Sequence, residues 1–248
     1  MEKSKDAGND PVIGSMFSVG AHYGYTKSRR HPSIKPYIFG VKNHVEIFDL
    51  EKTRDLLEEA KEFMRGVGRQ GKQVLFVSSK PEAVETVKAA AISIDMPYVA
   101  GRWIGGTLTN FSVIRARVQK LLDLTQEREG GELNKYTKKE RLLIDREITR
   151  LETLFFGLIV MKSMPAVVFV IDSEKEKVAV AEAKKMNVPV VALLGSDCNI
   201  DNVSFPIVGN DSASASINFF VKEIITAYRE GRSNIEIKPA TAVVKTSK

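Results

Sequence analysis

Short runs of apolar and β-branched residues recur along the chain and predict strands. The last three runs are almost continuously apolar, which is typical of parallel strands covered by helices on both faces. Segments 79–82 and 173–176 follow two of the runs and match the capping box, in which Ser79 or Ser173 accepts a hydrogen bond from a free backbone N–H. The alternation of strand, turn and helix indicates an α/β doubly wound fold with a mainly parallel sheet. The four runs are 45–48, 73–77, 166–171 and 189–194.

Residues 107–155 interrupt this alternation with two longer helical patterns around a polar turn at 129–132. We expect an antiparallel helical hairpin that projects from the sheet domain, because a hairpin with one narrow apolar seam is solvated on its other faces. Segment 137–140 matches a further capping box and begins the second helix. Periodicity alone leaves open that both helices cover the sheet. The apolar positions, three or four residues apart, are Phe111, Ile114, Val118 and Leu121, then Ile144, Ile148, Leu151 and Phe155.

The pattern divides the chain into four parts. The two ends lack apolar periodicity, so we expect them to be flexible. The sheet domain is discontinuous because the hairpin is inserted into it. The parts are an N-terminal segment at 1–14, an α/β domain at 15–106 and 164–231, a hairpin at 107–163 and a C-terminal tail at 232–248.

Composition narrows the class of protein. The net charge of +6 favours a polyanionic partner without proving one. The single cysteine, Cys198, excludes an intramolecular disulfide and a thiolate-rich zinc site, and it fits a reducing cytoplasm. The longest apolar stretch, 154–161, is far shorter than the ~20 residues that cross a bilayer, and the polar segment 1–10 lacks the apolar core of a signal peptide. We therefore expect no membrane partner and no export.

Catalytic motifs are sparse. The chain has no Gly-x-Gly-x-x-Gly motif after a strand, no phosphate loop and no Gly-x-Ser-x-Gly elbow. A phosphate-ligand-binding enzyme remains the alternative, with Ser78, Ser79 and the turn at Asp172 at the carboxyl end of the sheet. Its weakness is that no nucleophile is paired with a positioned base. Asp172 is better explained as the start of the following helix turn. We expect no catalytic activity and no cofactor.

Metal binding is not expected either. The histidines show no metal-ligand spacing, and only His22 together with Asp197 and Asp201 forms a weak candidate set. A structural hydrogen bond is the preferred role for His22.

A basic segment at 26–35 contains four cations and no acid, and Pro32 disfavours a helix there. An extended basic segment can lay cations along a phosphate backbone and release counterions. The simpler alternative is a solvated loop. Three tyrosines flank the segment, and they can stack on unpaired bases or anchor the loop to the core; for Tyr37 we favour anchoring. The cations are Lys27, Arg29, Arg30 and Lys35, and the other tyrosines are Tyr23 and Tyr25.

The stretch 101–110 contains a glycine pair and the only tryptophan. Glycines let backbones approach closely, and Thr107 or Thr109 can cap the helix that follows. Such a loop suits phosphate contact through N–H groups at a helix N-terminus. We expect Trp103 to pack where the hairpin meets the sheet domain, in preference to stacking on a base.

Several sequence blocks occur in a characteristic order along the chain, among them Gly-Ala-His-Tyr-Gly at 20–24, Lys-Pro-Tyr-Ile-Phe-Gly at 35–40 and Arg-Trp-Ile-Gly-Gly-Thr-Leu-Thr-Asn at 102–110. Together they resemble the bacterial-type family of small-subunit ribosomal protein S2. The similarity extends from about Phe17 to Arg232, and so many blocks in one order are far more specific than any single block. The remaining blocks are 30–32, 49–53, 137–140, 169–172, 206–211 and 228–232.

The resemblance implies a flavodoxin-like sheet domain with an inserted coiled-coil hairpin, bound to small-subunit ribosomal RNA and neighbouring ribosomal proteins. It implies a bacterial or organellar ribosome in the cytoplasm or organelle, and we do not expect a homo-oligomer. Tyr25, His31 and segment 195–201 depart from the family pattern, which indicates a divergent lineage. The expected RNA-binding residues are Lys27, Arg29, Arg30, His31, Lys35, Arg102, Thr107, Asn110 and Arg115.

Overall fold

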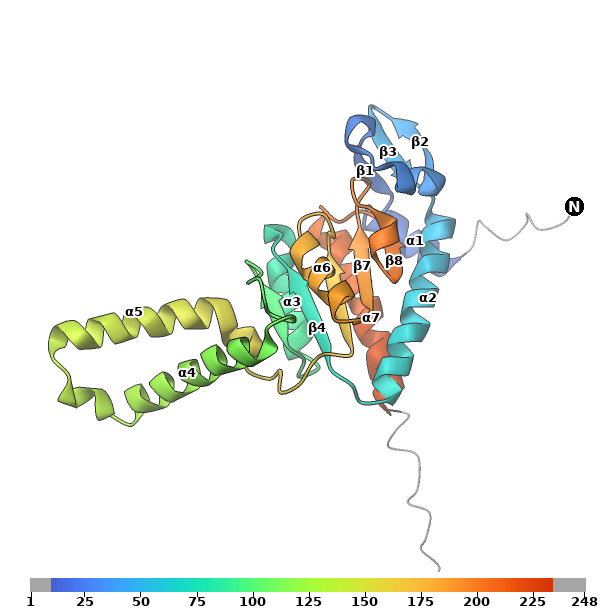
Figure 1. Ribbon diagram of the computed structural model, residues 1–248. Helices are drawn as coiled ribbons and strands as arrows, with labels where there is room; N and C mark the ends of the chain where they lie inside the picture. The colour runs from blue at the N-terminus through green and yellow to red at the C-terminus, as the bar shows by residue number, and fades with distance from the viewer. Residues whose placement is uncertain (1–9, 234–248) are drawn as a thin grey trace, which may run out of the picture.

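A computed structural model describes residues 10–233 of the chain, apart from the side chain of Asn134. Its central feature is a parallel sheet with the strand order β5-β4-β6-β7-β8 (Figure 1). Along the chain this order is second, first, third, fourth, fifth, which is the flavodoxin-like order. The predicted doubly wound fold is confirmed. The strands are β4 (Val74–Ser78), β5 (Tyr98–Ala100), β6 (Val167–Ile171), β7 (Val190–Leu194) and β8 (Phe205–Val208).

Helices cover both faces of this sheet, so alternate strand residues enter two separate cores. Val74 and Phe76 pack under α1, α2, α3 and α7. Leu75 and Val77 pack under α6 and the base of the hairpin. None of the described helices is long and apolar enough to span a membrane. The covering helices are α1 (Pro11–Ser18), α2 (Leu50–Arg69), α3 (Pro81–Ile92), α6 (Lys177–Lys185) and α7 (Ser214–Ser233).

A second, antiparallel sheet of three strands forms the upper part of the molecule in Figure 1. The predicted strand at 45–48 is confirmed as β3 (Val45–Phe48), and it lies between β1 (Tyr23–Thr26) and β2 (Ile38–Lys42). The basic segment between β1 and β2 is not extended, contrary to prediction. It forms two 3₁₀ turns, η1 (Lys27–Arg29) and η2 (Pro32–Tyr37), because the His31 ring accepts the N–H of Ser33 and caps the second turn.

The inserted hairpin consists of α4 (Phe111–Glu129) and α5 (Lys138–Phe155), and it projects from the sheet domain (Figure 1). The short turns η3 (Glu132–Lys135) and η4 (Phe156–Leu158) lie at its tip and its base. The expected capping box is present, with Thr137 and Glu140 bonded reciprocally. Gly131 adopts a φ of +74° at the turn, a conformation that suits glycine. The apolar seam continues into the core beneath the sheet, because Ile114 and Leu151 share a cluster with Leu75 and Val77.

Other local predictions were wrong. Ser79 and Ser173 do not cap helices: α3 begins at Pro81 with no side-chain cap, and the Asp172 carboxylate accepts the N–H groups of Glu174 and Lys175 instead. The backbone N–H of Ser79 is already bonded to Glu176. Residues 11–14 were expected to be flexible, but they begin α1, because Asp10 caps the helix and Met16 is fully buried. Arg232 and Ser233 were expected in the flexible C-terminal tail, but they end α7. The remaining parts of the two predicted flexible ends, 1–9 and 234–248, lie outside the described residues.

Candidate nucleic-acid interface

The basic loop, which we define as residues 27–35, contains cations in three different situations. Lys27 and Lys35 are exposed and have no ion-pair partner within residues 10–233. Arg29 is also exposed, lies 4.3 Å from the centre of the Tyr25 ring and contacts Asp197 at 3.2 Å. Arg30 is half-buried and bonds the fully buried carboxylate of Glu46 at 2.9 Å. The loop therefore presents three cations to the surface and uses the fourth to hold its own conformation.

Backbone contacts fix the basic loop to the sheet domain. The N–H of His31 donates to the carbonyl of Ser196 at 2.8 Å, and the hydroxyl of Ser33 accepts the N–H of Ile200 at 3.1 Å. His31 is itself half-buried, and its ring is bonded to Ser33. The loop is thus a preorganised surface rather than a freely solvated strand, which lowers the entropic cost of binding a partner.

The flanking tyrosines serve different purposes. Tyr25 donates or accepts a hydrogen bond with Ser212 at 2.6 Å and supports Arg29 on its ring face. Tyr37 is half-buried beside Ile34, in agreement with the anchoring role expected for it. Tyr23 is 49% exposed, the most exposed of the three, and its ring packs against that of His22 with 4.0 Å between the ring centres.

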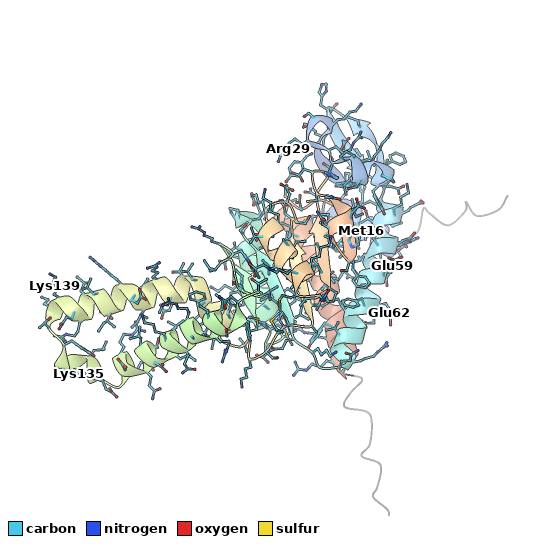
Figure 2. The ribbon with its side chains drawn as sticks, viewed as in Figure 1. Met16, Arg29, Glu59, Glu62, Lys135 and Lys139 are labelled. Carbon is cyan, nitrogen blue, oxygen red and sulfur yellow. The ribbon has the colours of Figure 1, made fainter. Side chains whose placement is uncertain are left out.

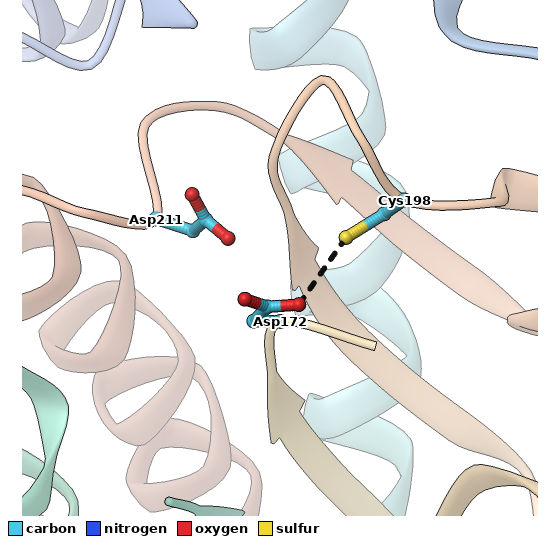
Figure 3. Close-up of side chains that lie close together, drawn as sticks. All are labelled: Asp172, Cys198 and Asp211. Atoms are coloured by element: carbon cyan, nitrogen blue, oxygen red, sulfur yellow. Dashed lines mark hydrogen bonds between the residues drawn. The ribbon is translucent and has the colours of Figure 1, made fainter. Parts of the chain in front are cut away.

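His22 does not join Asp197 and Asp201. Its ring lies 4.4 Å from that of Phe17, and burial lowers its pKa, with Lys42 adding to the effect. Its Nδ1 is buried without a hydrogen-bond partner, so the expected structural hydrogen bond is absent at that atom. Among the described residues, the group with metal-ligand geometry is Asp172, Cys198 and Asp211 (Figure 3).

The loop 101–110 does cradle an anion, but the anion belongs to the protein. The carboxylate of Glu182 on α6 accepts the N–H groups of Gly106, Leu108 and Thr109 at 2.7–3.1 Å. The indole N–H of Trp103 also donates to it. Burial would raise the pKa of Glu182, but these backbone N–H groups outweigh burial and lower it. The prediction that N–H groups of this loop are free for phosphate was therefore wrong for those three groups.

The remaining expected contact residues differ in accessibility. Thr107 is fully buried and its hydroxyl donates to the carbonyl of Ile104, so its side chain does not reach the surface. Neither Thr107 nor Thr109 caps α4, whose N-terminal cap is Asn110. Arg102 and Asn110 are exposed. Arg115 is half-buried and donates to the carbonyl of Met161 across the hairpin base. Trp103 packs against the core beneath the hairpin, in line with the expectation.

The carboxyl ends of β4 and β6 form the switch point of the sheet, where doubly wound proteins usually bind ligands. Here the ammonium group of Lys80 fills that position. It lies 2.8 Å from the carboxylate of Asp172 and 2.5 Å from that of Asp211, and all three side chains are buried. Figure 3 shows the two carboxylates facing the same space, with the thiol of Cys198 beside Asp172.

Electrostatics at the switch point are those of a closed ion cluster. Burial would lower the pKa of Lys80, but Asp211 and Asp172 outweigh burial and raise it, so the ammonium stays charged. Burial raises the pKa of Asp211 to about 6, although Lys80 opposes the shift. Burial also raises the pKa of Cys198 to about 12, so the thiol is protonated and unreactive. The cluster offers a scaffold more than a reaction centre.

Sequence reasoning missed three residues that organise this end of the molecule: Lys80, Asp211 and Glu182. Lys80 lies two residues after the end of β4, in the turn at the carboxyl edge of the sheet, and that position was a usable signal. Asp211 and Glu182 carried none, because their partners are 131 and about 75 residues away along the chain.

Comparison with known proteins gives one consistent result. A family model described as ribosomal protein S2 matches residues 16–231. The small ribosomal subunit protein uS2 of Helicobacter acinonychis is 43% identical over 221 residues, which cover 89% of this chain and 90% of the relative. The protein of the same name from Wolinella succinogenes is 42% identical over 222 residues, covering 90% and 82% of the two chains. That of Helicobacter hepaticus is 41% identical over 222 residues.

Proposed function

The chain belongs to the family of ribosomal protein S2, and on that premise we propose how it acts. It is a structural constituent of the small ribosomal subunit and binds small-subunit ribosomal RNA in translation. The match over residues 16–231 carries this conclusion, because it includes both the sheet domain and the hairpin. The sheet domain serves as a rigid platform and the hairpin as a strut, and binding depends on neutralising phosphates and fitting folded RNA.

The surface cations of the basic loop are the first expected contact. Lys27 and Lys35 are free of ion pairs in the described part of the chain, so RNA phosphates would meet no internal competitor there. Arg29 is 60% exposed and would exchange its contact with Asp197, whose side chain is 15% exposed, for a phosphate. Within the basic loop, Arg30 holds the conformation through Glu46. Arg102 and Asn110 are exposed near the root of the hairpin and form a second expected contact. His31, Thr107 and Arg115 are half-buried or buried, and we propose that they support these contacts.

Salt dependence tests this interface. Replacing Lys27 and Lys35 by alanine should lower affinity for small-subunit ribosomal RNA and reduce the salt slope by about one unit per lost phosphate contact. Arg30→Ala is the contrasting variant, because it leaves Glu46 buried without its partner and should lower stability as well as affinity. An unchanged slope in Lys27→Ala/Lys35→Ala, and also after Arg29→Ala is added, would reduce the loop to a solvated segment.

We infer that the chain has no catalytic activity. The matching proteins are named as ribosomal proteins, and Lys80 fills the position where an enzyme of this fold would bind its ligand. A hollow of about 410 Å³ remains in front of Ser79, lined by Arg102, Trp103 and Glu176 among others. A screen against nucleotides and sugar phosphates, with Ser79→Ala and Asp172→Asn as variants, addresses the enzyme alternative. Turnover that either substitution abolishes would favour an enzyme.

The setting of the protein is the small ribosomal subunit of a bacterial-type ribosome. We propose a cytoplasmic or organellar location, contact with neighbouring small-subunit proteins, and no homo-oligomer. The purified chain should sediment as a monomer, join small subunits in a gradient and leave them at high salt. Self-association at micromolar concentration would contradict the monomer.

A further inference from the structure

The hollow in front of Ser79 lies at the carboxyl edge of the main sheet and has a volume of about 410 Å³. Its walls come from the turns after three neighbouring strands: Ser79 follows β4, segment 101–103 follows β5, and segment 175–178 lies after β6. Small-molecule sites measure about 300 to 1,000 Å³, and doubly wound sheets bind their ligands at this edge. Lys80 does not line the hollow, so the space is separate from the buried ion cluster.

Two cations line the hollow from different turns, Arg102 after β5 and Lys175 after β6. Both side chains are exposed, and neither has an ion-pair partner in the described part of the chain. The backbone before Arg102 is fixed, because the N–H of Gly101 donates to the carbonyl of Ser78 at 2.8 Å. The N–H of Lys175 donates to the carboxylate of Asp172 at 3.0 Å. Two cations held in this way favour an anion, and a guanidinium group binds phosphate oxygens through two parallel hydrogen bonds.

This pair of cations is separate from the other basic parts of the molecule. Figure 2 labels Arg29 in the basic loop and Lys135 and Lys139 at the tip of the hairpin, and none of the three lines the hollow. A nucleic-acid strand needs a groove with cations along its backbone, whereas the hollow offers two. It therefore fits one small anionic molecule better than a chain.

An apolar wall accompanies the two cations. The indole N–H of Trp103 donates to the carboxylate of Glu182 at 3.2 Å, which holds the ring in place where it lines the hollow. Val178 also lines it and is 50% exposed. Ligand sites combine aromatic and aliphatic surface with a few polar groups, and nucleobases stack on aromatic rings. The lining suits a ligand that carries both an anionic group and a planar ring.

Glu176 is the one acid among the residues that line the hollow. It is buried, and its Oε1 accepts the N–H of Ser79 at 2.6 Å. Burial raises the pKa of Glu176, which favours the neutral carboxyl, although the hydrogen bonds from Ser79 oppose the shift. Even when Glu176 is ionised, two cations face one acid, so the hollow keeps a positive charge.

We propose that this hollow binds a mononucleotide, with its phosphate between Arg102 and Lys175 and its base against Trp103. The site goes beyond the proposed function and involves no chemical step, because the nucleotide is bound and not converted. Arg102 is also an expected contact to ribosomal RNA, so the nucleotide occupies the protein outside the subunit. A nucleoside phosphate uses both the cations and the ring of one hollow of this size.

Trp103 is the only tryptophan of the chain, so its fluorescence reports directly on the hollow. The full-length protein is titrated with AMP and GMP, and calorimetry measures the same affinities independently. Adenosine, which lacks the phosphate, and ribose 5-phosphate, which lacks the base, are titrated in the same way. We expect both nucleotides to change the fluorescence and to bind with a dissociation constant of about 10 to 100 µM, at least tenfold tighter than either fragment.

Arg102→Gln and Lys175→Gln each remove one cation and leave Trp103 in place. Each substitution should weaken the binding of AMP by about tenfold, because it removes a charge-assisted hydrogen bond to the phosphate. The matched control is Lys184→Gln/Lys185→Gln, which removes two exposed cations from the last turn of α6 and should bind AMP as the parent does. Urea unfolding checks that each variant folds.

Four results would overturn the nucleotide site. The first is no binding of AMP or GMP by either method up to about 1 mM. The second is an affinity for AMP that both cation variants retain or that the control loses equally. The third is an affinity for AMP no higher than that for adenosine or ribose 5-phosphate. The fourth is a single-stranded RNA tetranucleotide that binds more tightly than AMP and is weakened by the same substitutions, which would identify an RNA contact. None of these results bears on the proposed function, which the salt dependence of binding to ribosomal RNA tests separately.

Discussion

The ammonium group of Lys80 lies between the carboxylates of Asp172 and Asp211, and only 3% of the lysine surface is exposed. Two buried carboxylates without a counter-ion are very unfavourable, since burial of an unpaired charge costs far more than the pair contributes. The Lys80 ammonium group therefore makes it possible to bury both carboxylates at the switch point of the sheet.

Substitution of Lys80 by methionine should lower the free energy of unfolding at pH 7 by about 3 to 5 kcal/mol, because it leaves both carboxylates unpaired. Adding Asp172→Asn and Asp211→Asn should restore much of that loss. Urea unfolding measures both effects, and Lys88→Met, at an exposed lysine, should stay within about 0.5 kcal/mol of the parent. A small loss in Lys80→Met would mean that water or an ion already reaches the cluster.

The pH dependence of stability should report Asp211. Burial raises its pKa from 3.8 to about 6, so between these values the folded protein holds a proton that the unfolded chain has released. The contribution of Asp211 is fully present below its unfolded pKa and is lost as pH rises through about 6. The difference in unfolding free energy between the parent and Asp211→Asn should fall over this interval, by at most about 1.4 kcal/mol per pH unit. A difference that does not change with pH would contradict the shift.

At the scale of the elements, contacts between helices and loops hold the sheet domain and the hairpin together. Helix α6 supplies Glu182 to the loop that leads into α4, so one carboxylate joins the sheet domain to the root of the hairpin. Glu182→Ala leaves three backbone N–H groups without an acceptor, each worth about 1 to 3 kcal/mol when buried.

We expect Glu182→Ala to lower the free energy of unfolding by about 1 to 3 kcal/mol, mainly through the buried N–H of Leu108, and to speed amide exchange in residues 103–110. Urea unfolding and hydrogen exchange measure these two effects. Glu174→Ala is the matched control, because Glu174 is exposed and bonded only to Lys177. Protection of the loop that survives in Glu182→Ala would show that other contacts hold it.

Helices α2 and α7 cross at glycines. A Cβ on Gly68 would collide with the backbone of Tyr228, and one on Gly231 would collide with the backbone of Arg65. Helix α2 also contains Gly66, and a Cβ at that position would meet open space. Glycine is therefore needed at one position of α2 and only tolerated at the other.

Gly68→Ala should destabilise the protein by about 1 to 3 kcal/mol, because the two helices must move apart. Gly66→Ala should instead stabilise it by up to about 1 kcal/mol, since alanine favours a helix interior. Thermal or urea unfolding of the two variants gives the comparison. Equal effects of the same sign would mean that α2 and α7 can separate without cost.

At the scale of the whole molecule, the structure has a compact sheet domain with a long lever attached to one side (Figure 1). The base of this hairpin shares its hydrophobic core with the sheet domain. Ile114, Val118 and Leu151 belong to the same core as the sheet residues Leu75 and Val77, whereas the outer part of the hairpin packs only on itself.

Replacement of residues 110–152 by a short Gly/Ser linker tests the proposed domain division. We expect the sheet domain to keep a cooperative unfolding transition, because its two faces retain most of their buried residues. The urea concentration at the midpoint of unfolding should fall, since the deletion uncovers part of the core under the hairpin. Circular dichroism during urea unfolding provides the measurement. Loss of the cooperative transition would show that the helices are part of one folding unit.

Local patterns in the sequence determined a large part of this architecture. The apolar runs that became β4, β6 and β7, the three-four spacing of α4 and α5, and the capping box at Thr137 all follow from neighbours within a few residues. The order of sequence blocks identified the family, and the comparisons confirm it. The basic loop was also visible as a run of cations, because charge density is a property of the sequence itself.

Tertiary structure alone decided which distant segments and which charges meet. The three-residue strand β5 shows little sequence pattern of its own, and Tyr98–Ala100 become a strand only because β4 pairs with them. Arg30 bonds Glu46, Lys80 bonds an acid 131 residues away, and Glu182 occupies the N–H groups that the sequence offered to phosphate. Strand order brings these partners together, and burial makes each pairing obligatory, because an unpaired buried charge costs several kcal/mol. The sequence contains the groups, but their distances exist only after folding.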